Sequence, residues 1–228
     1  MNHWSNEIPA VLIAGGRPIE AGVIIDLISS AVGKTPGFSV AYIGAASGDN
    51  LAFFAMMRSM LIRAGAGKVT FVRLARKKID AAAVQDTLDR ADVLFISGGE
   101  VEDGMVWIKK HGLEAYLKGL YAGGKLFICT SAGAIMMGTH WVRWSIPGDD
   151  STAELFDCLG IIPDVFDTHA EDEDWVELKT VLRLLGNDSR GRGLPRGCII
   201  SADSRGELIN LNQTFLTFIN DNGQVRLV

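Results

Sequence analysis

The sequence has few cysteines and no long apolar run. Cys129, Cys158 and Cys198 are widely spaced, odd in number and set among apolar neighbours. This pattern predicts buried free thiols in a reducing compartment rather than a disulfide framework. No apolar run is long enough to cross a bilayer, and the first ten residues lack the basic flank and apolar core of a signal peptide. We therefore expect a cytoplasmic protein with no membrane partner.

Concentrated positive charge is also absent. Lysine and arginine number 22 against 27 aspartate and glutamate residues, which gives a formal net charge of -5. The basic cluster between Arg73 and Lys78 is short and is typical of a solvated loop. Without a basic patch, nucleic acid is not an expected partner.

Signatures of a cofactor or a metal ion are missing too. The early stretch AGGRPIEAG lacks the glycine spacing of a dinucleotide-binding turn. The acidic run from Glu171 to Asp174 has one neighbouring histidine and no cysteine, so we interpret it as the start of a helix, where the dipole favours carboxylates. The sequence therefore predicts neither a cofactor nor a metal site.

Short apolar runs alternate regularly with amphipathic segments over the first 138 residues. This alternation predicts a mostly parallel sheet with helices on both faces, which is a three-layer αβα, flavodoxin-like α/β architecture. We expect one domain over residues 1–228. The expected strands are Ile8–Ala14, Phe38–Ile43, Val69–Leu74, Asp92–Ser97 and Leu126–Cys129. Four helices are expected. The first begins at Pro18, and the second runs to about Ala64 from a cap at Ser47, Asp49 or Asn50. The third runs from the Asp80 cap to about Arg90, and the fourth spans Val106–Tyr121 with an interruption at Gly112.

The pattern is looser after Gly138. Loops or short strands are expected over residues 140–150, and antiparallel strands at the C-terminus, joined at the end by a hairpin turn at Asp221-Asn222-Gly223. The remaining expected elements are a short helix over Glu154–Leu159, a strand over Val165–Thr168, a helix over Trp175–Leu185 and strands over Cys198–Ser201, Glu207–Leu211 and Thr214–Ile219.

One stretch, KLFICTSAGAIMMG at residues 125–138, joins an apolar run to a helix-like run through small residues. Ser131 stands at the junction, an arrangement typical of a nucleophile elbow, in which the hydroxyl is exposed above the sheet. The N–H of Ala132 begins the following helix and is placed to donate to a developing oxyanion. The alternative is that the small residues only let this helix pack close to the sheet.

A serine nucleophile needs a base, and the sequence has four histidines. His3 lies in a terminus expected to fray, and His111 lies within a helix. His169 follows an apolar strand, and ligands of this architecture gather at the strand ends. We therefore expect His169 to be the base, with His140 as a weaker alternative. A polar residue that is merely satisfied at a strand end is the other interpretation.

The glycine pair Gly98-Gly99 follows another expected strand directly. It can free a backbone N–H to complete an oxyanion hole, although an ordinary tight turn would use the same residues. The neighbouring Gly98, Glu100 and Thr130 are expected to contact the substrate.

Four segments together resemble the serine peptidases of the dipeptidase E and cyanophycinase type, whose fold is similar to that of class I glutamine amidotransferases. The resemblance covers most of the chain up to His169. The segments are IGAASGD (Ile43–Asp49), FISGG (Phe95–Gly99), CTSAGA (Cys129–Ala134) and LGIIPDVFDTH (Leu159–His169).

The resemblance implies a role for each matched residue. Ser131 would be the nucleophile and His169 the general base, while the N–H groups of Gly99 and Ala132 would form the oxyanion hole. The implied reaction is hydrolysis of a peptide or isopeptide bond through an acyl-enzyme, often next to an aspartyl residue, with no metal or organic cofactor.

The chain also departs from this family. Arg196 stands where members carry the carboxylate that orients the histidine, which could lower the rate about 10⁴-fold if nothing replaces that acid. Asp167 is the candidate replacement because side chains two apart on a strand face the same way; Glu171 and Asp172 are others. The acidic segment after His169 would repel β-carboxylates, which argues against aspartyl specificity and against cyanophycin as substrate.

The leading hypothesis is a serine peptidase-like hydrolase acting on a small peptide or isopeptide. Its rival is a catalytically silent protein that binds a small ligand in the same crevice, motivated by Arg196. An amidotransferase is disfavoured because that chemistry needs a cysteine at the elbow, and Cys129 lies two residues early. A homodimer is compatible with the sequence.

Overall fold

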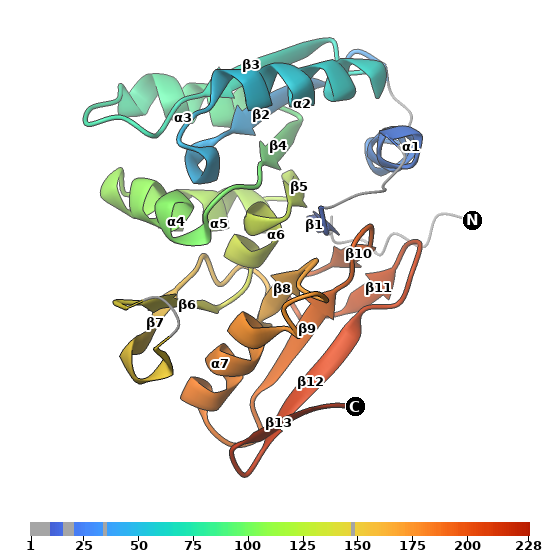
Figure 1. The fold of residues 1–228 in the computed structure, drawn as a ribbon. Helices are drawn as coiled ribbons and strands as arrows, with labels where there is room; N and C mark the ends of the chain where they lie inside the picture. Colours follow the sequence, from blue (N-terminus) through green and yellow to red (C-terminus); the bar gives the residue numbers. More distant parts are fainter. Residues whose placement is uncertain (1–9, 16–20, 34–35, 147–148) are drawn as a thin grey trace.

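The structure is a computed structural model and describes residues 10–15, 21–33, 36–146 and 149–228 (Figure 1). The helices are α1 (Ala21–Ala31), α2 (Leu51–Arg63), α3 (Ala81–Arg90), α4 (Val101–Lys110), α5 (Glu114–Ala122), α6 (Ala132–Met137) and α7 (Val176–Leu185), with 3-10 turns η1 (Ala45–Ser47) and η2 (Asp150–Thr152). The strands are β1 (Ala10–Ile13), β2 (Ser39–Ile43), β3 (Lys68–Val72), β4 (Val93–Ile96), β5 (Leu126–Thr130), β6 (His140–Trp144), β7 (Ala153–Asp157), β8 (Phe166–Thr168), β9 (Arg190–Leu194), β10 (Ile199–Ala202), β11 (Leu208–Asn210), β12 (Leu216–Asp221) and β13 (Gln224–Leu227).

A seven-stranded sheet in the order β11-β10-β1-β5-β4-β2-β3 forms the centre of the fold. β1, β5, β4, β2 and β3 run parallel, whereas β10 and β11 join antiparallel at one edge. Every residue of β1, β4 and β5 is buried, as expected for strands covered on both faces. The expected mostly parallel α/β architecture is confirmed.

Two hydrophobic clusters lie on opposite faces of this sheet. Alternate residues of β1 divide between them, because successive side chains of a strand point to opposite faces. Leu12 joins the cluster that contains Leu88 of α3 and Ile108 of α4, while Ile13 joins the one with Leu61 of α2. Helices therefore cover both faces and make three layers.

A second sheet, in the order β13-β12-β9-β8, lies beside the first together with α7 (Figure 1). β8 pairs with β9 in parallel, and the other pairs are antiparallel. A separate hairpin of β6 and β7 contacts α7. The carboxyl end of β8 meets the first sheet next to the end of β5.

Local signals explain several element boundaries. Asn50 and Asp80 cap α2 and α3 by accepting from the N–H groups of Phe53 and Ala83 at 2.9 Å and 3.1 Å. The last hairpin turns at Asn222-Gly223, where both residues have positive φ. The expected residues Ile8 and Pro18 lie outside the described part of the chain.

Two expectations for the second half are wrong. The segment expected as a helix over Glu154–Leu159 is strand β7, because Phe156 and Leu155 pair with Trp141 and Val142 of β6. Tertiary pairing overrides local preference in so short a segment. β9 was not expected at all, since its sequence RGRGL is rich in glycine.

The remaining differences concern helix boundaries. α4 begins at Val101, five residues earlier than expected, and the chain breaks at Gly112 before α5. The acidic run 171–174 lies in turns ahead of α7 rather than in its first turn.

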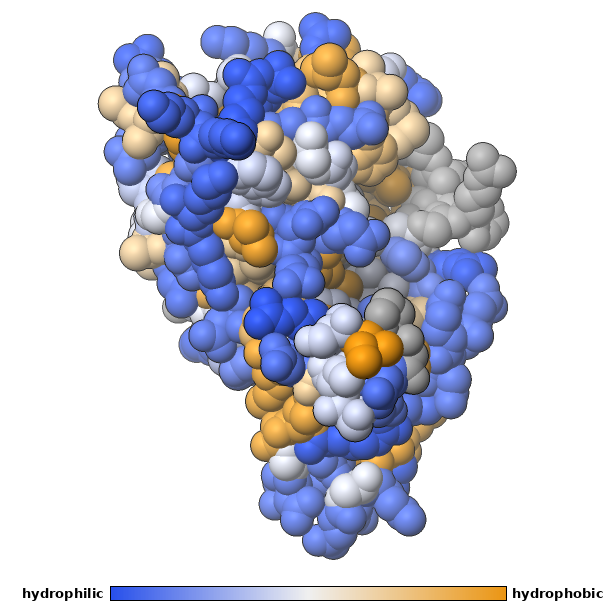
Figure 2. All heavy atoms as spheres, turned by 60° about the vertical axis from the view of Figure 1, so that its left-hand side comes forward, coloured by the Kyte–Doolittle hydropathy of each residue, from blue (hydrophilic) through white to orange (hydrophobic). Residues whose placement is uncertain are grey.

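No helix within the described ranges has the length and apolar character needed to span a membrane. Figure 2 shows hydrophilic side chains over most of one face, with apolar ones gathered in small separate groups.

Candidate active site

Ser131 lies between the end of β5 and the start of α6, at the centre of the seven-stranded sheet. Its φ of 51° and ψ of -121° fall outside the regions that non-glycine residues favour. Its N–H donates to the carbonyl of Ile13 in β1 at 2.9 Å, and its own carbonyl accepts from Ala134. These bonds hold the strained turn, so that the side chain projects from the sheet edge.

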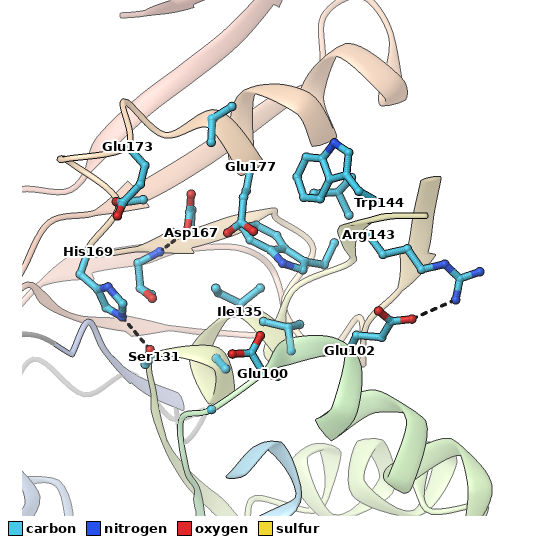
Figure 3. A pocket seen from close by; sticks show the side chains of 18 of the residues that line it. Glu100, Glu102, Ser131, Ile135, Arg143, Trp144, Asp167, His169, Glu173 and Glu177 are labelled. Atoms are coloured by element: carbon cyan, nitrogen blue, oxygen red, sulfur yellow. Dashed lines mark hydrogen bonds and ion pairs between the residues drawn. The ribbon is translucent and has the colours of Figure 1, made fainter. Parts of the chain in front are cut away.

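His169 follows β8 and therefore comes from the second sheet. Its N–H donates to the carbonyl of Leu194 in β9 at 2.8 Å, and its φ is 48°. Its Nε2 lies 2.7 Å from Oγ of Ser131 (Figure 3). The structure thus brings the two residues singled out in the sequence into hydrogen-bond contact.

Gly99 follows β4 and has a φ of 142°, a conformation that L side chains rarely adopt. A Cβ at this position would lie 2.1 Å from the carbonyl oxygen of Ala46, which accepts the N–H of Glu100 at 2.8 Å. The N–H of Gly99 has no hydrogen-bond acceptor among the described residues. Ala132 begins α6, where helix N–H groups lack partners within the helix. Both residues line one cavity with Ser131.

That cavity has a volume of about 860 Å³ and opens beside the Ser131–His169 pair (Figure 3). Part of its wall is apolar and includes Ile135, Trp141 and Val142. Another part is acidic, and its carboxylates are Glu100, Glu102, Asp150, Asp167, Glu173 and Glu177.

Asp167 is 2% exposed and lies among other acids. Its Oδ1 accepts the N–H of Thr168 at 2.7 Å, while its Oδ2 is buried with no hydrogen-bond partner among the described residues. Burial raises the pKa of Asp167 to about 7, and repulsion from Glu177 and Glu173 adds to this shift, while the backbone N–H groups of Thr168 and Leu178 oppose it. A carboxyl in this state is half protonated near neutral pH.

None of the three carboxylates named as orienting acids is hydrogen-bonded to His169 in the described structure. Asp167 uses one oxygen on Thr168, and its other oxygen is unpartnered. Glu171 accepts the Arg196 N–H at 2.6 Å, and Asp172 pairs with the Arg196 guanidinium. Same-face placement along a strand fails here because β8 ends at Thr168 and His169 turns to positive φ.

The other predicted residues divide into two groups. Glu100 lines the cavity, whereas Gly98 and Thr130 are buried and do not. His140 lies away from Ser131, its Nε2 3.5 Å from Asp157, and the Nε2 of His111 lies 2.9 Å from the carbonyl of Leu74.

Sequence reasoning placed an acidic segment that includes Glu173 near the site, but it missed Glu177 on the same wall of the cavity. Glu173 and Glu177 are four residues apart, so the two side chains lie on the same face if the turn before α7 has helical geometry. The position of Glu177 across the cavity from Glu100 had no signal in the sequence.

Comparison with known proteins identifies relatives of the whole arrangement. The model of Peptidase family S51 matches residues 11–207. A peptidase from an acI-B1 Actinobacterium has a similar fold, with a TM-score of 0.71, 17% identity and coverage of 96% of each chain. A Listeria monocytogenes EGD-e protein, provisionally assigned as peptidase E, gives a TM-score of 0.65 at 17% identity, covering 90% of this chain and 98% of its own. No curated protein sequence matches the chain.

Proposed function

The chain belongs to peptidase family S51, and from this membership we propose that it is a serine-type hydrolase that cleaves a peptide or isopeptide bond through a Ser131–His169 pair. One observation carries the proposal: Ser131 Oγ lies 2.7 Å from His169 Nε2 at the edge of a cavity of about 860 Å³. This separation is within reach for proton transfer between a nucleophile and its base.

In the proposed reaction, Oγ of Ser131 attacks the carbonyl carbon of the scissile bond while His169 Nε2 takes the hydroxyl proton. The carbonyl oxygen becomes an oxyanion. When the carbon–nitrogen bond breaks, His169 returns the proton to the departing amine and an acyl-serine remains. A water molecule then attacks the acyl carbon, gives its proton to His169, and the carboxylate product leaves as the proton returns to Ser131.

The oxyanion would be stabilised by the N–H groups of Gly99 and Ala132. Support comes from their position, since both line the cavity with Ser131 and the Gly99 N–H has no described acceptor. Donors that are already in place and unpaired need no rearrangement when charge develops on the substrate oxygen.

We do not assign an orienting acid to His169. Its position is held by its backbone N–H bond to Leu194 and by the contact with Ser131. Asp167, the earlier candidate, has its Oδ1 on Thr168. A hydrolase of this kind would work below the rate of one with a complete triad.

The second candidate, a catalytically silent ligand-binding protein, is favoured by the environment of Arg196. The backbone and guanidinium of Arg196 hold Glu171 and Asp172, two acids that follow His169 in the sequence. In that case the strained turn at Ser131 would serve only to shape the cavity.

Labelling by a fluorophosphonate separates the two candidates. We expect the wild-type protein to form a stable adduct at Ser131, located by peptide mass spectrometry, and Ser131→Ala to form none. Turnover of members of a peptide library should be lost in the same variant. A folded wild-type protein that is neither labelled nor active on any peptide would leave the silent binding protein as the better account.

A further inference from the structure

The cavity beside Ser131 carries more negative charge than its own cations neutralise. Of its six carboxylates, Glu102 pairs with Arg143 at 3.1 Å, and Asp150 accepts a hydrogen bond from Trp144 Nε1. Arg143 also pairs with a carboxylate outside the cavity. Four lining carboxylates have neither a cationic partner nor a side-chain donor within the described ranges: Glu100, Asp167, Glu173 and Glu177.

Three of these acids are close enough to repel one another. Burial raises the pKa of Glu177, and the negative charges of Glu100 and Glu173 raise it further. Figure 3 shows Glu100 and Glu177 entering the cavity from opposite sides, with Glu173 and Asp167 on the side nearer His169. Like charges held around one space destabilise the empty protein, and a positive ligand between them would relieve that repulsion.

Two buried oxygens at the same cavity lack hydrogen-bond partners. Asp167 and Thr168 are 2% and 3% exposed, and Oδ2 of Asp167 and Oγ1 of Thr168 are unpartnered among the described residues. Both residues line the cavity. The N–H of Leu178 in α7 lies close enough to Asp167 to lower its pKa, so the Thr168 hydroxyl is the group left without any partner. Because buried polar atoms are nearly always satisfied in folded proteins, this hydroxyl points to a partner supplied from outside the chain.

The shape of the acid cluster favours an organic cation over a metal ion. No three His, Cys, Asp or Glu side chains in the described ranges converge closely enough to hold a metal ion. The carboxylates instead face an apolar wall that includes Ile135, Trp141 and Trp144. A long aliphatic chain with a charged end matches both surfaces, since its stem can pack on apolar side chains while its head meets the acids.

We propose that this cavity recognises a peptide residue with a long, positively charged side chain, lysine or arginine, next to the scissile bond. The stem packs against Trp144 and Ile135, and the charged end is surrounded by Glu100, Asp167, Glu173 and Glu177. That the ligand is a peptide rests on the proposed function; the recognition of its charge does not require turnover.

Binding to Ser131→Ala, which cannot form an acyl-enzyme, tests the recognition alone. Isothermal titration would compare acetyl-Ala-Lys-Ala-amide with the norleucine and glutamate versions of the same peptide. The lysine peptide should bind roughly tenfold more tightly than the norleucine peptide, which equals about 1.4 kcal/mol, and the glutamate peptide should bind most weakly. Acetylation of every peptide removes the competing terminal amine.

A second substitution in the same background locates the effect. Glu177→Gln should remove most of the preference for lysine over norleucine and leave norleucine binding unchanged. Asp103→Asn is the matched control: it makes the same charge change in α4, at an exposed position outside the cavity, and should keep the preference. Glu173→Gln replaces Glu177→Gln if thermal melting shows that the latter is unfolded.

Several results would overturn the recognition. One is equal affinity for the three acetylated peptides, and another is a preference for lysine over norleucine that survives Glu177→Gln. A third is tighter binding of the norleucine peptide without its acetyl group than of the acetylated lysine peptide, because the cavity would then recognise a terminal amine. Fluorophosphonate labelling of the wild type reports separately on the hydrolase. Labelling without charge preference removes only this inference, and charge preference without labelling removes only the hydrolase.

Discussion

The two sheets contribute differently to the same cavity. The seven-stranded sheet supplies Ser131 and Gly99 at the ends of strands that are buried throughout. The segment from β8 into α7, attached to the four-stranded sheet, supplies His169 and three of the unpaired carboxylates. One side therefore holds the proposed nucleophile in a strained turn, and the other side contributes most of the negative charge of the cavity.

The largest effect is expected when the proposed base is removed from the second sheet while the first sheet is left intact. His169→Ala should lower the rate of Ser131 labelling by roughly 10³-fold or more, since an isolated serine hydroxyl is a poor nucleophile. His140→Ala is the control, because that ring lies near Asp157 and outside the cavity. Labelling rates followed by mass spectrometry measure both. If the two variants lose equally little, the pair does not act as nucleophile and base.

A substitution at the end of a strand in the first sheet should lower the labelling rate less than His169→Ala does, but it should lower the free energy of unfolding strongly. In Gly99→Ala, the new methyl group would meet the Ala46 carbonyl and the backbone would be strained at a φ of 142°. We expect a loss of about 4 kcal/mol in the free energy of unfolding and about 10²-fold in labelling rate.

Gly112→Ala provides the control for backbone strain alone. That glycine also has positive φ, 66°, but nothing lies within 4 Å of its Cβ position. Its cost should be about 1 kcal/mol, with unchanged labelling. Equal losses for both glycines, measured by urea unfolding, would mean that close contact with Ala46 contributes nothing.

Asp167 tests the charge on the second sheet through pH. Its pKa is raised to about 7 in the folded protein from the usual 3.8, so the folded state retains a proton that the unfolded chain has released over that interval. The contribution of Asp167 to stability is therefore complete below about pH 4 and is lost as pH rises toward and through 7, because ionisation places a buried charge beside Glu173 and Glu177.

Asp167→Asn should remove this loss. The variant should exceed wild type by roughly 2–4 kcal/mol at pH 8 and by much less at pH 5, as measured by urea unfolding. Asn can still accept the Thr168 N–H through its side-chain oxygen. Asp26→Asn, at an exposed site in α1, should show no such pH dependence. A wild-type advantage at pH 8 would contradict the raised pKa.

Arg196→Ala should have the smallest effect. The side chains of its ion pair with Asp172 are exposed, 43% for Arg196 and 70% for Asp172. Exposed pairs contribute less than about 1 kcal/mol to the free energy of unfolding. Labelling of Ser131 should stay close to the wild-type rate. A large increase in labelling would instead show that Arg196 holds Glu171 or Asp172 away from His169.

The first sheet was the more predictable of the two regions. β1, β4 and β5 are short apolar runs buried on both faces, and Asn50 and Asp80 cap their helices as expected. Composition and periodicity were sufficient there because each residue's preference agrees with its surroundings.

The second sheet was less predictable because contacts distant in sequence determine it. β9 contains Gly191 and Gly193, whose absent side chains admit Leu178 and Trp175 at close range; a Cβ would lie 2.6 Å and 2.9 Å from their atoms. Only the partner elements reveal why glycine forms a strand here.

The candidate site was predictable in part. The strand-end argument and the family resemblance led to Ser131 and His169, which lie in contact. The meeting of Glu100 and Glu177 in one cavity was not predictable, because it depends on how the segment from β8 into α7 folds over the end of the first sheet. The expected Asp167–His169 relation failed at a single residue, where the backbone leaves the strand at His169.

The origin of the hydrogen-bonded pair in two sheets has a consequence for biosynthesis. Ser131 leaves the ribosome 38 residues before His169, and the edge strand β10 that pairs with β1 follows later still. A nascent chain that exposes the serine therefore still lacks His169, the imidazole that contacts Ser131 in the folded protein. The proposed hydrolase would therefore become competent only after both sheets had been synthesised and had come together.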